Sequence, residues 1–483
     1  MAGLSESEIE AVARRIADEL RGKAASAAAP ATVGPSPRAP LSTAGSYATV
    51  DGAVRAAATA HSPFVRLPLA VRAKIIAAIR TAMREHGEQL ARAAFEETGL
   101  GRVEDKIVKN RLVTEKTPGV EVLAPASVTG DHGLTLIEPA PYGVIAAITP
   151  CTNPTSTIIC NAIGMLAAGN TVVFNAHPLA ARCSLQTVAL LNDAIRAAGG
   201  PPDVVTCLAT PTIETAQELM HHPGVRLLVV TGGGAVVRAA QASGKRAICA
   251  GPGNPPVVVD ETADLGKAAR DVVLGASCDN NIICVDEKEV ICVASVADDL
   301  IAAMTKCGAI AIDGRRLPEL ERAIFAEVPK PRQPAAVDKA LIGKNASVIL
   351  GRLGISAPAS VRLAVVEVDE NHPLLWSEQM MPVLPICRVP SADAAIDLAV
   401  RVEGGNRHTA VMHSKQLDNL SRMARECDCS IFVKNGRSQA GLGLDGEGFC
   451  SFTIASPTGE GLTGPWSFSR SRRCVLVDHF RIT

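Results

Sequence analysis

The sequence predicts an α/β protein built around a doubly wound, mostly parallel sheet. From Tyr142 to Cys249, short apolar segments alternate with segments of helical periodicity, a pattern typical of parallel strands joined by helices. The glycine cluster Gly232, Gly233 and Gly234 follows one predicted strand and opens a helix, where folds of this kind bind phosphate groups. The chain has 483 residues, too many for one compact core. We therefore expect roughly two or three domains.

Composition and charge are those of an ordinary globular protein, with 47% hydrophobic and 20% charged residues. Lysine and arginine number 48 against 49 aspartates and glutamates, so no overall field attracts nucleic acid or an anionic membrane. The 14 cysteines include no Cys-x-x-Cys pair, and the close pair Cys427 and Cys429 has no histidine at zinc-site spacing. We expect free thiols in a reducing cytoplasm and no metal site.

Two segments precede the predicted domains. Residues 1–22 carry apolar residues at helical spacing among charged ones, which predicts a short amphipathic helix. Its acidic residues argue against a mitochondrial transit peptide, and it lacks the apolar core of a secretory signal. Residues 23–45 are rich in Ala, Pro, Ser and Gly and predict a flexible linker. A lone helix of this length is marginal in water, so it either frays or docks on its own chain or on a partner.

Helices come first after the linker, and alternating elements follow. Residues 50–98 are rich in alanine with helical spacing and predict several helices, and residues 133–139 alternate as a strand does. Next we expect strands at 143–148, 171–174, 204–208, 227–230 and 246–249, with helices at 155–166, 185–197, 212–221 and 235–241. Residues 139–181 carry no charge, but Pro, Gly and Asn interrupt them, which favours strand, helix and strand over a membrane span.

A second α/β region begins at residue 257. We expect its strands at 257–259, 290–293, 347–350 and 364–366, with helices between them. Near the end of the chain, residues 468–477 predict a basic turn that leads into a strand.

One cysteine stands apart by its surroundings. Cys284 follows two amides and two apolar residues and precedes a charged and apolar run, which suits a nucleophile on a loop before a strand. Taken alone, a cysteine is more often a small buried apolar residue. The pattern Asn-Asn-x-x-Cys-x-x-Glu-Lys resembles the nucleophile segment of aldehyde dehydrogenases, in particular their CoA-acylating branch. The resemblance extends over nearly the whole chain, which is similar to the propionaldehyde dehydrogenases of bacterial microcompartments.

The resemblance implies that Cys284 and Asn153 are the catalytic residues. A thiolate is the side chain best able to form the tetrahedral adduct of an aldehyde near neutral pH, and the adduct oxygen needs donors fixed in advance. Asn153 matches the family's Asn-Pro turn that supplies one donor, and the backbone N–H of Cys284 would supply the other. Asn-Pro also favours turns on its own, which is the structural alternative for Asn153.

The resemblance also implies the cofactor residues. Thr231 and the glycine cluster would contact NAD, although an ordinary tight turn is the alternative. Glu378, followed by Pro-Val at the family's spacing, would bind the nicotinamide ribose. Where the family usually has Lys-Pro after a strand, Asn175 and His177 stand here and become candidates for the adenine side. No acidic residue excludes a 2′-phosphate, so NAD is preferred over NADP on resemblance alone.

The segment 248–256 predicts which nucleophile releases the product. Hydrolytic family members carry a water-activating Glu in a motif resembling Glu-Leu-Gly-Gly-Lys, and this segment has no carboxylate. The resemblance therefore implies that coenzyme A takes the acyl group from Cys284, so that a short aldehyde, with propanal preferred and acetaldehyde second, becomes acyl-CoA with formation of NADH. His177, His408 and His413 are candidate acids or bases, though such histidines are often merely packed. The alternatives are a non-acylating dehydrogenase acting on acetaldehyde or a similar aldehyde, and a catalytically idle scaffold.

The resemblance finally implies an aldehyde dehydrogenase-like arrangement of domains. We expect a dinucleotide-binding domain over residues 46–256 with part of an oligomerisation arm near 126–142, an α/β catalytic domain over 257–440, and a return to the first domain and the arm over 441–483. Such an arm implies a homo-oligomer, either a dimer or a tetramer. Residues 1–21 resemble the encapsulation peptides that bind microcompartment shell proteins, which implies a cytoplasmic location inside a microcompartment. No membrane or nucleic-acid partner is expected.

Overall fold

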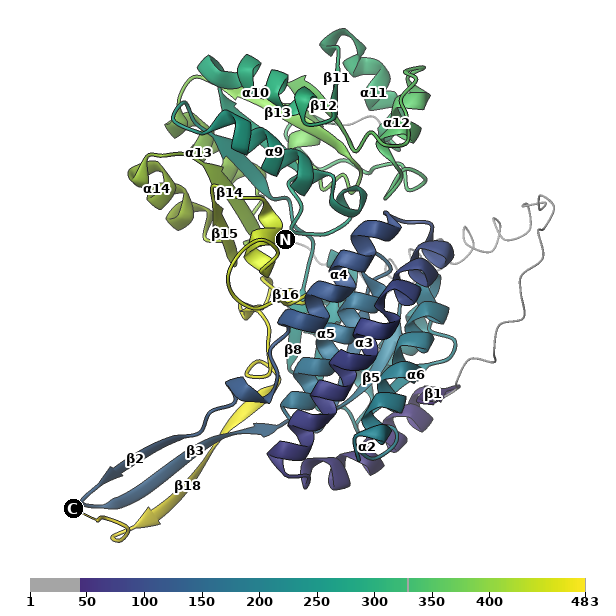
Figure 1. Ribbon diagram of the computed structural model, residues 1–483, viewed down its shortest axis with the longest axis vertical. Helices are drawn as coiled ribbons and strands as arrows, with labels where there is room; N and C mark the ends of the chain where they lie inside the picture. The colour runs from purple at the N-terminus through teal and green to yellow at the C-terminus, as the bar shows by residue number, and fades with distance from the viewer. Residues whose placement is uncertain (1–43, 328–329, 483) are drawn as a thin grey trace, which may run out of the picture. The chain divides into compact units, whose positions relative to one another are not determined.

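The computed structural model describes residues 44–327 and 330–482 (Figure 1). The predicted amphipathic helix and most of the predicted linker lie outside these residues. The last two residues assigned to the linker already belong to the fold, because the backbone N–H of Cys207 donates to the carbonyl of Gly45 at 2.8 Å.

The first sheet is parallel throughout, with strand order β1-β6-β5-β4-β7-β8. Its strands are β1 (Ser46–Tyr47), β4 (Val144–Thr149), β5 (Thr171–Ala176), β6 (Val205–Leu208), β7 (Leu227–Thr231) and β8 (Ala247–Ala250). The chain runs outward from β4 in one direction through β5 and β6, and in the other through β7 and β8. This order confirms the predicted doubly wound fold.

Helices cover both faces of the first sheet. They are α2 (Val50–Val65), α3 (Leu69–Thr98), α4 (Val103–Lys116), α5 (Pro154–Ala167), α6 (Ala181–Ala197), α7 (Ile213–His221) and α8 (Gly234–Ala242). Successive strand residues point to opposite faces, so Ala146 of β4 packs with α2, α7 and α8, whereas Ile145 packs with α3, α5 and α6. Because both faces are buried, β4 is apolar almost throughout, as the sequence predicts for a parallel strand.

A second parallel sheet has the order β11-β12-β13-β10-β9-β14-β15. Its strands are β9 (Pro256–Val259), β10 (Glu289–Val293), β11 (Ala309–Ile312), β12 (Leu363–Val368), β13 (Val383–Val389), β14 (Thr409–His413) and β15 (Ile431–Lys434). The helices of this region are α9 (Leu265–Ala276), α10 (Ala294–Lys306), α11 (Leu317–Ile324), α12 (Ala346–Arg352), α13 (Ala392–Val402) and α14 (Leu417–Cys427).

The strand predicted at Ser347–Leu350 is wrong, because these residues lie in α12. The apolar run contains β-branched residues, and a run this short does not distinguish a strand from a buried helix. The helical spacing is visible only in the structure: Ala346, Ile349 and Leu350 are buried, whereas Val348 is 49% exposed.

A three-stranded antiparallel sheet forms the arm at the lower end of Figure 1. It consists of β2 (Ala126–Gly130), β3 (Gly133–Pro141) and β18 (Ser469–Val477), in the order β18-β3-β2. The predicted basic turn is wrong, because Arg470, Arg472 and Arg473 lie within β18, each opposite a residue of β3. The first half of β18 consists of serine and arginine and has no apolar run, which is why the sequence suggests a turn at this place.

The remaining elements are short. They are the pair β16 (Ile454–Ala455) and β17 (Gly461–Leu462) and the 3-10 helices η1 (Val120–Val122), η2 (Pro178–Ala180), η3 (Cys278–Asn281), η4 (Gly314–Arg316), η5 (Pro373–Trp376) and η6 (Ser438–Leu442). No helix within residues 44–327 and 330–482 has the length and apolar character needed to cross a bilayer. The uncharged segment 139–181 forms the end of β3, then β4, α5 and β5, as predicted.

One short segment connects the two parallel sheets. Strand β8 ends at Ala250 and β9 begins at Pro256, so residues 251–255 lead directly from the carboxyl edge of the first sheet to the amino edge of the second. The strands of the first sheet all precede this segment, and those of the second all follow it. The domain boundary predicted here stays a prediction, but the change of sheet coincides with it.

Candidate active site

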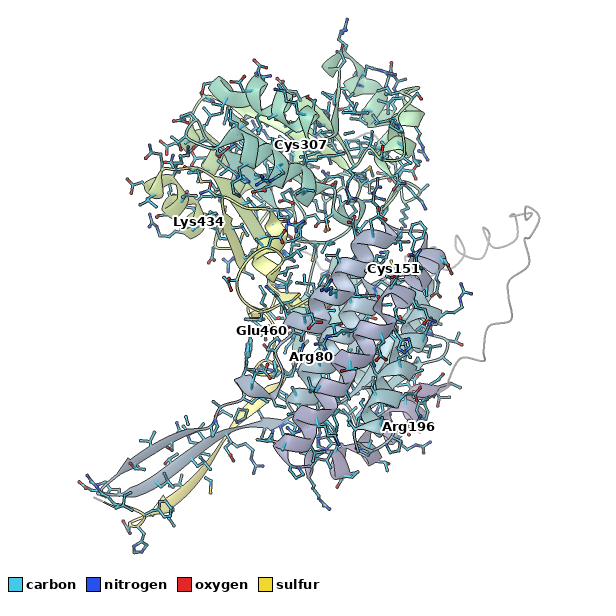
Figure 2. The ribbon with its side chains drawn as sticks, viewed as in Figure 1. Arg80, Cys151, Arg196, Cys307, Lys434 and Glu460 are labelled. Carbon is cyan, nitrogen blue, oxygen red and sulfur yellow. The ribbon has the colours of Figure 1, made fainter. Side chains whose placement is uncertain are left out.

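Four loops converge at the amino edge of the second sheet. Gly253 precedes β9, Cys284 precedes β10, Glu378 precedes β13 and His408 precedes β14. These strands are neighbours in the sheet order β13-β10-β9-β14, so their preceding loops lie side by side. The carboxyl edge of the first sheet contributes the loop after β4, which carries Asn153 and in which Cys151 is labelled in Figure 2.

Gly253 allows the loops of Cys284 and His408 to approach closely. A Cβ atom at Gly253 would lie 2.7 Å from the carbonyl oxygen of Cys284 and 2.9 Å from Cγ of His408. Both distances are shorter than real Cβ contacts, and the first contact is to backbone, so only glycine fits. The close approach of the two loops explains why residue 253, in the segment without a carboxylate, is a glycine.

Cys284 is half-buried, whereas most cysteines of the chain are buried, and all 14 are free thiols. Burial, and after it the nearby carboxylate of Glu378, raise the pKa of the Cys284 thiol to about 12 against the opposing effect of the ammonium group of Lys288. The thiol is therefore protonated at neutral pH in this arrangement. A nucleophilic role requires a base nearby or a ligand that changes the electrostatics.

The imidazole of His408 meets the requirements of such a base. The side chain is buried, its Nδ1 lies 2.9 Å from Thr409 Oγ1, and its Nε2 has no hydrogen-bond partner among the described residues. Burial, together with the charge of Lys288, lowers the pKa of His408 to about 4, so the ring is neutral at pH 7 and can accept a proton. His413 lies at the other end of β14, at the opposite edge of the sheet.

The Cys284 loop, defined here as residues 277–288, has an unusual backbone. Asp279, Asn280 and Asn281 have φ values of 46°, 58° and 65°, which places three consecutive residues with side chains in the left-handed region. Each such residue costs of order 1–2 kcal/mol and persists only where surrounding contacts hold it. The three side chains are fully or almost fully buried.

Side-chain hydrogen bonds hold this backbone in place. The amide nitrogen of Asn280 donates to the Gly343 carbonyl at 2.8 Å and to Asn345 Oδ1 at 2.9 Å. The ammonium group of Lys288 donates to the Asn281 carbonyl at 2.8 Å and to Asn281 Oδ1 at 2.7 Å. A lysine rarely lies fully buried without such acceptors, and these hydrogen bonds from Lys288 hold Asn281 in its left-handed conformation.

Asn153 occupies the N-cap position of α5 and is buried. Its Oδ1 accepts a hydrogen bond from Lys109 Nζ at 2.5 Å, and its Nδ2 donates to Thr152 Oγ1 at 3.2 Å. Lys109 and Lys106, both on α4, also donate to Asp279 Oδ2 in the Cys284 loop. A buried ion cluster therefore joins the Asn153 turn to the Cys284 loop.

Comparison with known proteins gives this arrangement a family. The family model described as "Aldehyde dehydrogenase family" matches residues 23–443. The chain belongs to this family. It is 51% identical over 439 residues to an acetylating acetaldehyde dehydrogenase of Salmonella typhimurium, over 91% of this chain and 93% of the relative.

Two solved structures extend the comparison. One is a Rhodopseudomonas palustris propionaldehyde dehydrogenase with bound CoA and an acylated cysteine, 48% identical with a TM-score of 0.87, covering 90% of this chain and 98% of that chain. The other is a propionaldehyde dehydrogenase from the Clostridium phytofermentans fucose utilisation bacterial microcompartment, 46% identical with a TM-score of 0.88, covering 91% and 100%. The aldehyde dehydrogenase-like fold and the resemblance to CoA-acylating enzymes are confirmed.

The family implies a nicotinamide dinucleotide, and the glycine turn, residues 231–234, fits its phosphates. The turn follows β7, and Gly233 is the N-cap of α8 with no side chain capping the helix. A Cβ at Gly233 would meet nothing within 4 Å, so the backbone there is open to a ligand. Thr231 Oγ1 lies 3.1 Å from Thr453 Oγ1, which fixes the start of the turn. Uncapped helix N–H groups beside glycines suit a pyrophosphate.

The other predicted cofactor residues differ in what they can offer. Glu378 is half-buried, and the N–H of Gly253 lies 3.5 Å from its Oε1. Burial raises the pKa of Glu378, and Lys288 lowers it. Asn175 uses both polar groups within the chain, accepting from Thr215 Oγ1 at 2.7 Å and donating to the Thr212 carbonyl at 3.4 Å. His177 is exposed beyond β5, where its Nδ1 accepts from the N–H of Leu179 at 3.1 Å.

Sequence reasoning missed the lysines of the site. Lys106 and Lys109 lie on α4, where charged residues at helical spacing suggest a solvated face. Lys288 ends the motif Asn-Asn-x-x-Cys-x-x-Glu-Lys, but the motif alone does not indicate what its side chain contacts. The available signal was the pair Lys106 and Lys109, three positions apart and therefore on one helix face, but only the fold reveals that Asp279 lies opposite them.

Proposed function

We propose that this protein oxidises a short aliphatic aldehyde, with propanal preferred, and transfers the acyl group to coenzyme A through a thioester on Cys284. The observation that carries this proposal is the close approach of the loops of Cys284 and His408 across Gly253, in a segment without a carboxylate. A neutral buried imidazole on the neighbouring loop is a base of the kind that activates a thiol, and no carboxylate of that segment competes by activating water.

The first step forms a bond between sulfur and carbon. The Nε2 atom of His408 takes the proton of the Cys284 thiol, and the sulfur attacks the carbonyl carbon of the aldehyde. The oxygen of the tetrahedral adduct then carries negative charge and accepts hydrogen bonds from Asn153 Nδ2 and the backbone N–H of Cys284. Each such fixed donor contributes about 2.7–4 kcal/mol to stabilising the transition state.

The second step converts the adduct into a thioester. The glycine turn would hold NAD, with Glu378 as the candidate to bind its ribose, and NAD would accept the hydride that leaves the adduct carbon. The carbonyl reforms while the acyl group stays on Cys284. Asn175 is a weaker candidate for the adenine side than His177, because α7 already engages both of its polar groups.

The third step passes the acyl group to coenzyme A. The proton that His408 took from Cys284 first passes to solvent, so the neutral imidazole is the candidate base for the proton of the CoA thiol, whose sulfur attacks the thioester carbonyl. The same two donors hold the new tetrahedral oxygen, and the Cys284 thiolate leaves and regains a proton from His408. The sum is aldehyde, NAD and CoA converted to acyl-CoA, NADH and one proton.

A hydrolytic dehydrogenase is the alternative, and the similarity to CoA-acylating enzymes does not favour it. Glu378 is close enough to influence the pKa of Cys284, so its carboxylate could activate water instead of binding the ribose. Steady NADH formation from an aldehyde in the absence of CoA would support that function and contradict the proposed one. An idle scaffold would show no turnover with either acceptor.

The test measures NADH formation from propanal with and without CoA, on the wild type and on Cys284→Ala. Turnover that requires both CoA and Cys284 is the expected result. Acetaldehyde is measured in parallel, because one methylene is worth only about 1–3 kcal/mol in a hydrophobic pocket. A kcat/KM for acetaldehyde above that for propanal would overturn the substrate preference but not the reaction.

Assembly and location are proposed on separate grounds. The arm exposes apolar side chains on β2 and β18, with Val128 63% and Val475 57% exposed, which supports pairing between copies in a dimer or tetramer. Residues 1–21, outside the described range, are proposed to bind a microcompartment shell protein in the cytoplasm. Deleting them should leave turnover unchanged and abolish co-purification with shells, whereas lost turnover would contradict a detachable tag.

A further inference from the structure

We infer that Lys109 is a positioning residue for the oxyanion site, because its ammonium group fixes the side-chain amide of Asn153 with the nitrogen facing the reacting centre. This inference rests on the proposed function. Lys109 Nζ donates to Asn153 Oδ1 at 2.5 Å, and both side chains are buried. An ammonium group has three donors and no acceptor, so only the oxygen of an amide can face it. The contact therefore excludes the flipped amide.

The position of Asn153 makes this contact informative. At an N-cap, an asparagine oxygen ordinarily accepts a backbone N–H from the first turn of the helix. The side chain of Asn153 makes no such hydrogen bond, and only its backbone carbonyl serves α5, accepting the N–H of Thr157 at 3.0 Å. The amide has thus left its usual structural role. Its Nδ2 has two N–H groups, of which one bonds Thr152 Oγ1.

The same ammonium group connects Asn153 to the Cys284 loop. Lys109 Nζ also donates to Asp279 Oδ2, and Lys106 Nζ donates to the same oxygen at 2.9 Å. Burial alone would raise the pKa of Asp279, but the two lysines lower it, so the carboxylate stays ionised and retains both of them. Lys109 therefore sets the position of the donor relative to the loop that carries the nucleophile.

Lys106 provides a matched control within the same cluster. It is as buried as Lys109, lies on the same face of α4 and pairs with the same carboxylate. Its second contact is the backbone carbonyl of Thr152 at 3.3 Å, and not the side chain of Asn153. Loss of either lysine leaves Asp279 with one ammonium group. Loss of Lys109 alone releases the amide.

The test is a double-mutant cycle on kcat/KM for the aldehyde, with Lys109→Met, Lys106→Met, Asn153→Ala and the double variant Lys109→Met with Asn153→Ala. Lys109→Met should lower kcat/KM by about 100-fold, the scale of one lost oxyanion donor, and Lys106→Met by less than about tenfold. In the Asn153→Ala background, Lys109→Met should cost less than about threefold, because residues that act through one another are not additive.

A second readout separates positioning from general damage to the fold. Alkylation of Cys284 by iodoacetamide forms no oxyanion, so its rate in Lys109→Met should stay within about twofold of the wild type. Additive losses in the cycle, equal losses for the two lysine variants, or alkylation that falls in parallel with turnover would each overturn the inference. An Asn153→Ala variant with full turnover would instead reject the oxyanion role in the proposed function itself.

Lys109→Gln covers the case in which Lys109→Met fails to fold. Glutamine keeps an N–H donor for Asn153 Oδ1 without the charge, so this variant should retain kcat/KM within about tenfold of the wild type. A loss larger than that, of the same factor in the wild-type and Asn153→Ala backgrounds, would overturn the inference.

Discussion

In the Cys284 loop, residues 278–283 are buried and held by hydrogen bonds, whereas the glycine turn at residues 231–234 is partly exposed and carries only one side chain, that of Thr231. The loop positions groups that react, so the protein fixes them before any ligand arrives. The turn faces a ligand that comes and goes, and its backbone N–H groups gain their partners on binding. Rigidity is concentrated where bonds change.

The contrast has an energetic side. Three consecutive left-handed residues store strain in the Cys284 loop, and buried lysines and amides offset it. The glycine turn stores none of this kind, since neither Gly232 nor Gly233 has a positive φ. A substitution in the loop should therefore damage stability and catalysis together, and one in the turn should change ligand binding alone.

The largest expected effect comes from Asn280→Ala. Alanine at φ 58° keeps the strain and removes the amide that donates to Gly343 and Asn345, so we expect the free energy of unfolding to fall by about 3 kcal/mol. The displaced loop should lower kcat by about 100-fold. Denaturant unfolding and steady-state kinetics provide the measurements.

Asn435→Ala is the matched control for that variant. Asn435 also has a positive φ, of 55°, and bonds Ser414, but it is exposed and follows β15 at the far edge of the second sheet. We expect a loss of about 1 kcal/mol and an unchanged kcat. Equal catalytic losses in the two variants would show that the Cys284 loop is not special.

An effect on stability alone, visible in its pH dependence, is expected for Glu287→Gln. Burial raises the pKa of Glu287 from 4.5 to about 7, while hydrogen bonds from Ser438 oppose the rise. Between these values the folded state binds more protons than the unfolded state, so the free energy of unfolding falls as pH rises, by up to about 3 kcal/mol. Glutamine cannot ionise and should remove this slope.

Thermal or urea unfolding at pH 4 and pH 8 measures the slope. The advantage of Glu287→Gln over the wild type should be larger at the higher pH. Glu218→Gln, the same substitution at an exposed position, is the control variant. The assigned direction would be contradicted if the free energy of unfolding of Glu287→Gln, relative to that of the wild type, were lower at pH 8 than at pH 4.

The smallest effect is expected in the glycine turn. In Gly233→Ala the new methyl group meets no protein atom and the φ of −66° suits alanine, so stability should change by less than about 0.5 kcal/mol. The methyl group should instead obstruct the dinucleotide and raise its KM by about tenfold, or about 1.4 kcal/mol, with little change in kcat. Gly314→Ala, equally open, is the neutral control. An unchanged KM would place the phosphates elsewhere.

The sequence was most informative where chemistry depends on neighbours along the chain. The residues of the Cys284 motif, of the Asn153 turn and of the glycine turn are each consecutive in the chain. Short apolar segments alternating with helical segments predict the strands of the first sheet. Contacts between distant segments escaped prediction, because nothing in α4 indicates that Lys109 meets Asp279. The helix at 346–352 escaped because a short apolar run fits two periodicities.

The central claim is a covalent acyl group on Cys284 that only a thiol acceptor removes efficiently. The direct measurement is mass spectrometry of the protein after incubation with propanal and NAD in the absence of CoA, followed by peptide mapping and then by addition of CoA. The account predicts one propanoyl group per chain, located on Cys284 and absent from Cys284→Ala, that leaves as propanoyl-CoA. Free propanoate released without CoA, or an acyl group on another cysteine, would contradict it.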